Sequence, residues 1–447
     1  MKIITDMKCN YFIALLFTIC SCFTANAKNE ITEESKTYEK TFSVNESTHI
    51  NLRNRRGNIN VVYREGSEAK IEVKLTVRAT VSSEIQKVFD HFQLDVKNSG
   101  NNIDIRSNDH IESWTQINTF FRSSNKIKFE DRIIAEDIDE IDVDMVLYIP
   151  KISKLSVDNK YNDILFTDLH CDLDVSLYSG KLKGKNIDGD LNMELKYGSV
   201  DIGSFINGDI DIYDSKYKSD NAQSVEFKSK YSDISCGDFK SLRFFSHDDE
   251  VILGSIEEEL IVEAKYSNLR LESFGTAEID GHDTDIKAKN GGSLDLRSKY
   301  GSFDFGDIQD ATLRLHDDNF EVASLKDLTI KNSKYSEIYI DYFSGAMLIS
   351  SSHDDDIYVL HPVNDFKSID VDLKYSTFKF PISSKKGFYM TADTKYGSLD
   401  LGRDFDHDRT HKDDDKSELN INGKASKTKK GDPKITINAY DSKIDLS

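Results

Sequence analysis

Apolar and polar residues alternate in short segments along most of this chain. Segment 191–195 (Leu-Asn-Met-Glu-Leu) is apolar at every second position, and segment 200–202 (Val-Asp-Ile) is so again after a turn at Gly198-Ser199. A period of two over a few residues is typical of a half-buried strand. The pattern therefore predicts a unit of two short strands around a corner.

This unit repeats through the middle of the chain. Its corner reads Lys-Tyr-Gly-Ser at 196, 299 and 395, and looser Lys-Tyr copies begin at 160, 230, 265, 334 and 374. A second version reads His-Asp at 247, 282, 316 and 353, and Tyr213-Asp214 fills the remaining place. Aligned together, these corners form one series with steps of 17 to 21 residues: 196, 213, 230, 247, 265, 282, 299, 316, 334, 353, 374 and 395.

A near-constant step of this length predicts a stacked solenoid. The units are too short for helical repeats, which need about 33 residues or more. We therefore predict an all-β chain, a single-chain parallel β-solenoid (β-helix) with rungs of about 17–21 residues over 151–402 and one short helix near the N-terminus. Successive rungs would lie about 4.8 Å apart, so the registered corners alone would span roughly 50 Å.

Stacking gives the alternation of Lys-Tyr with His-Asp a physical reason. A lysine on every rung would bring like charges about 4.8 Å apart, which is unfavourable. Alternating Lys with His, and Tyr with Asp, increases that separation and brings each lysine within diagonal reach of an aspartate. We interpret these residues as a structural ladder that fixes the register of the rungs: Lys230, Tyr231, His247, Asp248, Lys265, Tyr266, His282, Asp283, Lys299, Tyr300, His316, Asp317, Lys334, Tyr335, His353 and Asp354.

Metal binding is the alternative reading of the same corners. Oxygen ligands suit Ca²⁺, so the weaker candidates for a calcium site are the adjacent aspartates Asp248, Asp249, Asp317, Asp318, Asp354 and Asp355. The repeated signature of calcium-binding β-helix repeats, with its paired glycines, is absent, however. The corner histidines would lie about 10 Å apart, too far to share a zinc ion. We predict no metal and no cofactor.

A β-helix can also carry a carbohydrate-active enzyme, which would use carboxylates or a Lys, Arg or Tyr base. Catalysis needs one distinctive constellation, whereas this chain spreads the same groups over many rungs. It also lacks the GxSxG, HExxH, P-loop and Rossmann motifs. The repeat therefore favours a non-enzymatic protein without catalytic residues, and the enzyme stays an alternative.

The two ends of the chain differ from the middle. Residues 28–150 are predicted as an N-terminal β region with an insertion at 108–135 and an early, divergent rung at 55–61. A helix at about 83–92, begun by a capping box of Ser83 and Gln86, is expected to cover the end of the solenoid. Residues 403–418 are predicted as an acidic mobile loop, and 419–447 as the terminal rung.

The first 27 residues have the three parts of a secretory signal peptide. Lys2 and Lys8 precede an apolar run at 11–23, and 25–27 (Ala-Asn-Ala) is a cleavage pattern. We expect cleavage before Lys28 and a periplasmic, outer-membrane-associated or secreted protein, while Cys20 leaves lipid attachment open. The mature chain keeps Cys171 and Cys236, which form one disulfide or stay two buried thiols.

Charge excludes some partners. The 447 residues include 58 Lys or Arg and 79 Asp or Glu, for a net charge of −21. This acidity argues against binding of nucleic acid and against attraction to anionic lipid. No stretch after the signal is apolar for 18 residues, so no transmembrane helix is predicted in the mature chain.

The order of these features resembles the bacterial adhesin-like β-strand-repeat family of secreted and envelope proteins. An initial strand, a glycine-turn rung at 54–61, a short helix and a strand ending at Pro150 precede the Lys-Tyr rungs, and an Ile-Asn-Gly segment at 421–423 follows them. The resemblance covers roughly residues 40–447. It implies a β-helix and an envelope location, and it carries over no catalytic residue.

These observations together predict a non-enzymatic exported scaffold, an adhesin-like binding protein of the cell envelope or surface. Its expected partners are envelope or extracellular glycans or proteins. A periplasmic structural or stress-associated protein is the first alternative, and a carbohydrate-active enzyme on a β-helix is the second.

Overall fold

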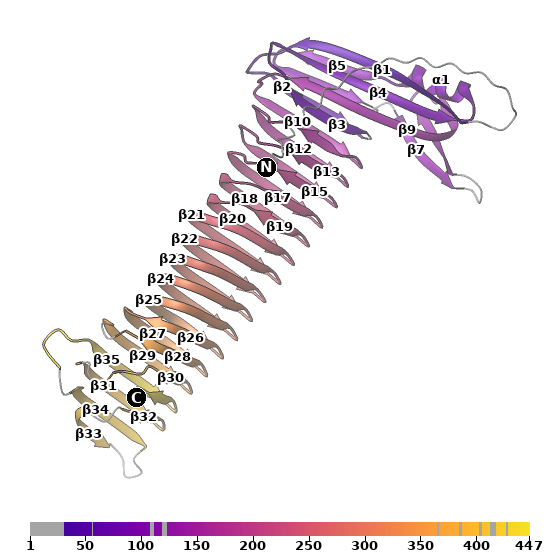
Figure 1. The fold of residues 1–447 in the computed structure, drawn as a ribbon. Coiled ribbons are helices and arrows are strands. Elements are labelled where there is room, and N and C mark those ends of the chain that lie inside the picture. Colours follow the sequence, from indigo (N-terminus) through magenta and orange to yellow (C-terminus); the bar gives the residue numbers. More distant parts are fainter. Residues whose placement is uncertain are drawn as a thin grey trace, which may run out of the picture.

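The computed structural model describes residues 31–55, 57–107, 111–118, 123–363, 366–383, 387–401, 405–411, 417–425 and 428–447. The expected signal peptide lies outside these residues. Within them, 36 strands and one helix form a parallel β-solenoid with additional strands at each end (Figure 1). The predicted fold class is therefore confirmed. None of the helices in the described ranges is long and apolar enough to span a membrane.

Each rung consists of a strand before the Lys-Tyr or His-Asp corner, called the A strand, and a strand after it, called the B strand. The separate A strands are β2 (His49–Asn54), β10 (Lys154–Lys160), β12 (Asp172–Tyr178), β14 (Leu191–Lys196), β16 (Asn207–Tyr213), β18 (Ala222–Lys230), β20 (Phe239–His247), β27 (Ala346–His353), β29 (Ser368–Lys374), β31 (Tyr389–Lys395) and β35 (Lys434–Tyr440). The separate B strands are β3 (Asn58–Tyr63), β11 (Ile164–Phe166), β13 (Lys181–Gly184), β15 (Ser199–Ile202), β17 (Lys216–Ser219), β19 (Asp233–Cys236), β26 (Glu337–Phe343), β28 (Asp356–Pro362), β30 (Thr377–Lys379), β32 (Ser398–Asp400) and β36 (Lys443–Asp445).

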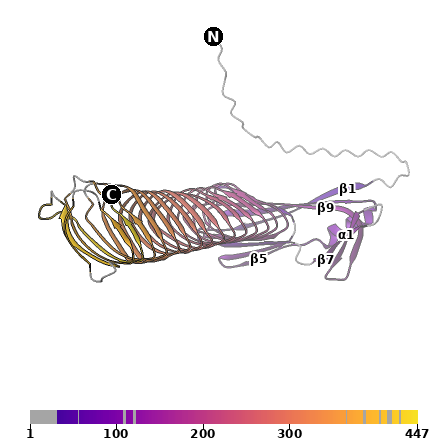
Figure 2. The ribbon, with the colours of Figure 1, turned by 90° about the horizontal axis from the view of Figure 1, so that it is seen from below.

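In the middle of the solenoid, the B strand of one rung continues into the A strand of the next. These long strands are β21 (Glu250–Lys265), β22 (Asn268–His282), β23 (Asp285–Lys299), β24 (Ser302–His316) and β25 (Asn319–Lys334). All of them pair in parallel with their neighbours. The rungs therefore stack along a rod, and Figure 2 shows them side by side.

Alternation decides which residues form the core. In β14 the apolar residues of the pattern are buried and the polar residues between them are exposed. The parallel register then places equivalent apolar residues in one column, as for Ile286, Phe303, Phe320 and Ile338, which are completely buried or nearly so. The core is therefore continuous along the rod, although each rung contacts only its neighbours.

The first rung of the solenoid is formed by strands β2 and β3. Strands β2 and β3 pair in parallel with β10 and β11, so these two strands, which flank and include part of the predicted segment 55–61, form an early rung. On the other side, β2 pairs with β6 (Asn102–Ser107), and β3 pairs with the end of β9 (Ile134–Ile149). These two strands, and not the helix, cover the first rung.

The N-terminal strands extend beyond the solenoid as an antiparallel sheet (Figure 2). Its further strands are β1 (Thr32–Ser43), β4 (Glu68–Ala79), β7 (Ile111–Asn118) and β8 (Ser123–Phe129). Strand β5 (Leu94–Ser99) pairs antiparallel with β6 instead. Helix α1 (Ser82–His91) packs on β1, β4 and β9 through Ile85, Val88 and Phe89. The expected capping box is wrong, because the N-cap is Val81 and no side chain caps the helix.

The C-terminal end does not follow the order of the sequence. Strand β35 lies between β29 and β31 and pairs in parallel with both, although it follows them in the chain. Strand β31 then pairs antiparallel with β34 (Glu418–Ala425), and β34 pairs with β33 (Phe405–His411). The last rung in sequence is thus not the last in space, and the segment expected as a loop at 403–418 contains strand β33.

Cys171 and Cys236, the cysteines in the described residues, are free thiols, and both are buried. Burial raises the pKa of Cys171 and of Cys236 to about 12, which keeps both thiols protonated. We expect a thiol-reactive dye to label neither residue in the folded mature chain and to label both in denaturant. Labelling of one or neither residue in denaturant without reductant would instead indicate oxidation or pairing.

Candidate functional site

The corner of each rung places one residue in the left-handed region of backbone conformation. Aspartate tolerates this conformation, whereas bulky side chains rarely adopt it. The backbone N–H of the corner residue donates to the next rung, as from Tyr231 to the His247 carbonyl at 3.0 Å. These corner residues have φ between 46° and 66°: Tyr161, Ser179, Tyr197, Asp214, Tyr231, Asp248, Tyr266, Asp283, Tyr300, Asp317, Tyr335, Asp354, Tyr375, Tyr396 and Asp441.

Every one of these corners contributes one aromatic ring, and the rings form a continuous row that we call the aromatic ridge. Neighbouring ring centroids are 5.3 to 6.4 Å apart, and the rings meet edge to face. Such a contact contributes about 0.5–1.5 kcal/mol beyond the burial of area. In spatial order the ridge consists of Tyr161, Tyr178, Tyr197, Tyr213, Tyr231, His247, Tyr266, His282, Tyr300, His316, Tyr335, His353, Tyr375, Tyr440 and Tyr396.

The ring comes alternately from the corner residue and from the residue before it. Where the corner is tyrosine, the residue before it is lysine; where the corner is aspartate or serine, the residue before it is histidine or tyrosine. Edge-to-face contact between the rings of successive rungs therefore explains the Lys-Tyr and His-Asp alternation, and this explanation was not predicted from the sequence. Among the described residues, no ion pair joins a ladder lysine to a ladder aspartate. The role of these residues in fixing the register stays a prediction.

Lysines form a second regular row beside the ridge, which we call the lysine column. It occupies alternate rungs and consists of Lys160, Lys196, Lys230, Lys265, Lys299, Lys334, Lys374 and Lys395. Lys395 pairs with Glu418 at 2.7 Å. In the part of the chain that the structure describes, the ammonium nitrogens of the other seven lysines have no carboxylate oxygen within 4.0 Å.

Lysines on the B strands behave differently. Lys216 and Lys287 pair across rungs with Asp233 at 3.3 Å and with Asp304 at 2.9 Å. Ion pairs between exposed groups contribute little stability, but they do occupy the lysine. Lysines elsewhere on the solenoid thus do form ion pairs, and most lysines of the lysine column do not.

The histidines of the ladder all lie in the ridge, each between two tyrosine rings. The Nδ1 atoms of His247, His282 and His353 are 2.9, 3.1 and 2.6 Å from a carboxylate oxygen of the corner aspartate on the same rung. The angle is not that of a hydrogen bond. Because tyrosines separate the histidines along the ridge, two of them do not meet at one position.

The two aspartates of each candidate calcium pair lie on opposite sides of the chain. The first occupies the exposed corner, and the second is buried inside the solenoid, in the pairs Asp248-Asp249, Asp317-Asp318 and Asp354-Asp355. Adjacent carboxylates therefore do not converge on one position. No group of three or more His, Cys, Asp or Glu side chains in the described ranges is arranged to hold a metal ion.

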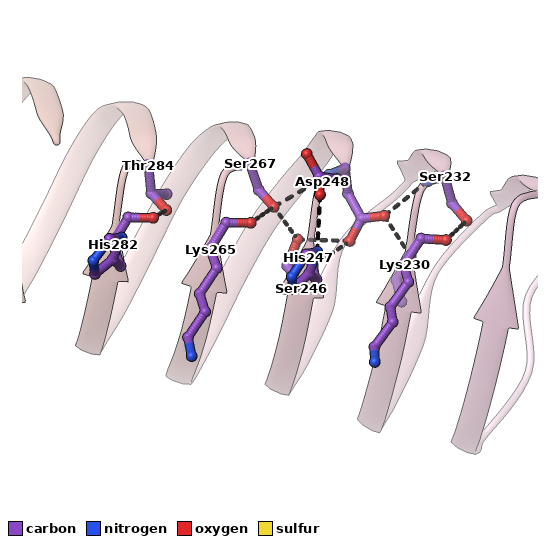
Figure 3. A network of polar contacts seen from close by, with 11 residues as sticks. Lys230, Ser232, Ser246, His247, Asp248, Lys265, Ser267, His282 and Thr284 are labelled. Atoms are coloured by element: carbon purple, nitrogen blue, oxygen red, sulfur yellow. Dashed lines mark hydrogen bonds and ion pairs between the residues drawn. The ribbon is translucent and has the colours of Figure 1, made fainter. Parts of the chain in front are cut away.

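The buried aspartates instead accept hydrogen bonds from the corners around them, and Figure 3 labels Ser232, Ser246 and His247, which donate to Asp249. Asp249 accepts from the backbone N–H groups of Ser232 and His247 at 2.8 and 2.9 Å, and from the hydroxyl groups of Ser246 and Ser229 at 2.7 and 3.0 Å. Burial raises the pKa of Asp249, and these hydrogen bonds oppose the rise. The second aspartate of each pair is therefore an internal structural element.

A groove of about 840 Å³ runs beside the ridge on the A strands. One wall is formed by six successive residues that directly precede a corner: Lys196, Tyr213, Lys230, His247, Lys265 and His282. The neighbouring column of side chains contributes Asp211, Lys228, Phe245, Glu263 and Asp280. Phe245 is half-buried at an outward position of its strand, where the pattern otherwise has polar residues, and it offers the groove an apolar surface.

The fold and this surface define a parallel β-solenoid with a ridge of aromatic rings and a column of lysines along one edge, and only Lys395 of that column forms an ion pair among the described residues. No protein-family model matches the chain, and no curated protein matches its sequence. Three solved structures are similar to it over much of their length. A putative adhesin from Bacteroides fragilis has 12% identity and a TM-score of 0.21, with 67% of this chain and 94% of that chain covered.

The second of these is a putative cell adhesion protein from Clostridium sporogenes, with 8% identity, a TM-score of 0.16 and coverage of 92% of this chain and 99% of that chain. The third is a putative lipid binding protein from Parabacteroides distasonis, with 9% identity, a TM-score of 0.19 and coverage of 73% and 96%. At such identities and TM-scores these likenesses carry no argument about function.

Proposed function

We propose that this protein is an exported, non-enzymatic binding scaffold of the cell envelope, an adhesin-like protein that holds its ligand along the aromatic ridge. The observation that carries the proposal is the exposed ridge, which continues from rung to rung, with its lysine column on alternate rungs. A repeated row of identical groups suits an extended ligand, whereas catalysis needs one singular constellation. The signal-peptide pattern of residues 1–27 supports export.

Surface labelling tests this function. Cells that produce the protein from its own signal sequence are treated with a membrane-impermeant, amine-reactive biotin reagent. We expect the mature chain to become labelled in intact cells, because most lysines of the column are exposed. Mass spectrometry of the purified chain should show a mature N-terminus at Lys28.

Two outcomes would contradict the proposal. Labelling only after permeabilisation of the cells would exclude a surface adhesin and leave a periplasmic structural role. Turnover of a polysaccharide, lost on substitution of one or two residues, would show that the protein is a carbohydrate-active enzyme.

A further inference from the structure

We propose that the groove and the lysine column bind a linear acidic polysaccharide that lies parallel to the solenoid axis and presents an acidic group to every second rung. This inference rests on the proposed function, because it names the ligand class of that surface. It is argued from three features of the molecule: the period of the lysines, the rings between them and the distribution of charge on the two sides of the ridge.

The regular spacing of the lysines matches a polymer with evenly spaced groups better than a small molecule. Parallel strands lie about 4.8 Å apart, so lysines on alternate rungs recur at roughly twice that distance. An extended chain of pyranose sugars that are 1,4-linked, or alternately 1,3- and 1,4-linked as in hyaluronan, advances by nearly one rung per sugar. A polymer with one acidic group per disaccharide can therefore place each acidic group beside one lysine over many rungs.

Aromatic rings fill the rungs between the lysines. Along the wall of the groove the order is Lys196, Tyr213, Lys230, His247 and Lys265. Sugar rings pack their C–H faces on aromatic side chains, which supply rigid contact area at low entropic cost. Phe245 lies next to this wall, between Lys228 and Glu263 in the neighbouring column. The groove thus offers a cation and an apolar contact to successive sugars.

Charge indicates which side of the ridge an anion would occupy. The exposed corner aspartates lie one residue beyond the lysine positions, toward the B strands, and repel a polyanion there. On the groove side, Asp280 lies 3.6 Å from Arg297, and Lys228 is paired with Glu226 at 2.6 Å. The remaining carboxylates of the groove, Asp211 and Glu263, can accept hydrogen bonds from sugar hydroxyl groups.

Binding measurements with purified mature protein test the proposal. The probes are hyaluronan oligosaccharides, which carry one carboxylate per disaccharide, neutral chitin oligosaccharides and poly-glutamate. We expect hyaluronan oligomers to bind and their affinity to rise with length, because each added disaccharide reaches another lysine. Binding should also weaken with salt, since the pairs are exposed.

Matched double variants locate the site. Lys230→Gln with Lys265→Gln removes two neighbouring lysines of the column and should weaken binding of the long oligomer by about tenfold. Lys216→Gln with Lys287→Gln makes the same change of charge on the B strands and should leave the affinity within about twofold. Circular dichroism melts of both variants check that they are folded.

Several results would overturn the inference. Equal weakening by both double variants would show a diffuse charge effect, and equal binding of poly-glutamate would show that the sugar is not recognised. Binding of neutral oligosaccharides alone would leave the proposed envelope function standing but exclude an acidic ligand. If the protein is labelled on intact cells but binds none of the probes, the acidic-polysaccharide inference is wrong and the proposed envelope function still stands. If it is labelled only after permeabilisation, the proposed function itself is wrong.

Discussion

Removing residues 431–447 is expected to detach the C-terminal strands β31–β34 while the rest of the solenoid stays folded. The reason is the position of β35, which is the strand that joins β31 to β29. The deletion also removes the buried residues Ile435, Ile437, Ile444 and Leu446, each of which stabilises the fold by about 1.5–3 kcal/mol. Hydrogen exchange should show lost protection in β31 and β34 and kept protection in β21–β25, because rungs stabilise only their neighbours.

Adding a synthetic peptide of residues 431–447 provides the control, since it should restore protection of β31 and β34. The contrary outcome is that β31 moves by one rung and pairs directly with β29, which would keep its protection without the peptide. The ridge argues against this movement. Lys395 would then lie beside Lys374, and Tyr396 beside Tyr375 at the same corner position, so the edge-to-face row would be interrupted.

The sequence predicted the solenoid because its period is local. Alternation in each strand and a step of 17 to 21 residues are both visible within a short window. The position of strand β35 does not follow from such a short window, because β35 lies between β29 and β31, which both precede it in the chain. A signal was present, however: the corners at 374 and 395 both read Lys-Tyr, which breaks the alternation, and Tyr440-Asp441 restores it when placed between them.

The site residues were recognised as a repeat, but their arrangement was not predicted. Charge separation at each position predicts only which groups alternate, whereas the ring of the ridge comes from two adjacent positions in turn, from one rung to the next. The direction of Asp248 and Asp249 also depends on the left-handed corner between the strands, which a pattern of period two does not describe. The groove is formed by the A strands of successive rungs, so it is not visible within one repeat, and the alternation does not mark Phe245.

Replacing the buried Asp318 with alanine is expected to lower the free energy of unfolding by about 2–4 kcal/mol at neutral pH, because buried donors lose their acceptor. Asp318 accepts hydrogen bonds from the backbone N–H groups of Gly301 and His316 at 2.7 and 2.6 Å, and from the Ser298 hydroxyl at 2.8 Å. Urea unfolding measures the change. Asp317→Ala is the matched control; it alters an exposed corner and should cost about 1 kcal/mol through backbone strain alone. Equal losses in the two variants would contradict a special role of the buried carboxylate.

Titration of the same carboxyl group should make stability depend on pH. Burial raises the pKa of Asp318 above its usual 3.8, although hydrogen bonds from Gly301, His316 and Ser298 oppose the rise. Between the usual and the raised pKa, the folded chain keeps a proton that the unfolded chain releases. The free energy of unfolding contributed by this group is therefore greatest below the usual pKa, falls as pH rises to the raised pKa and is constant above it.

The variant Asp318→Asn removes this titration and leaves the other buried aspartates in place. The unfolding free energy of the wild type minus that of the variant should consequently decrease as pH rises above 3.8 and then level off. Urea unfolding of both proteins from acid to neutral pH measures this difference. A difference that grows with pH would mean that the surrounding N–H and O–H donors stabilise the carboxylate more than burial destabilises it. In that case the corner would be an anion-stabilising site within the solenoid, and the pKa of Asp318 would lie below its usual value.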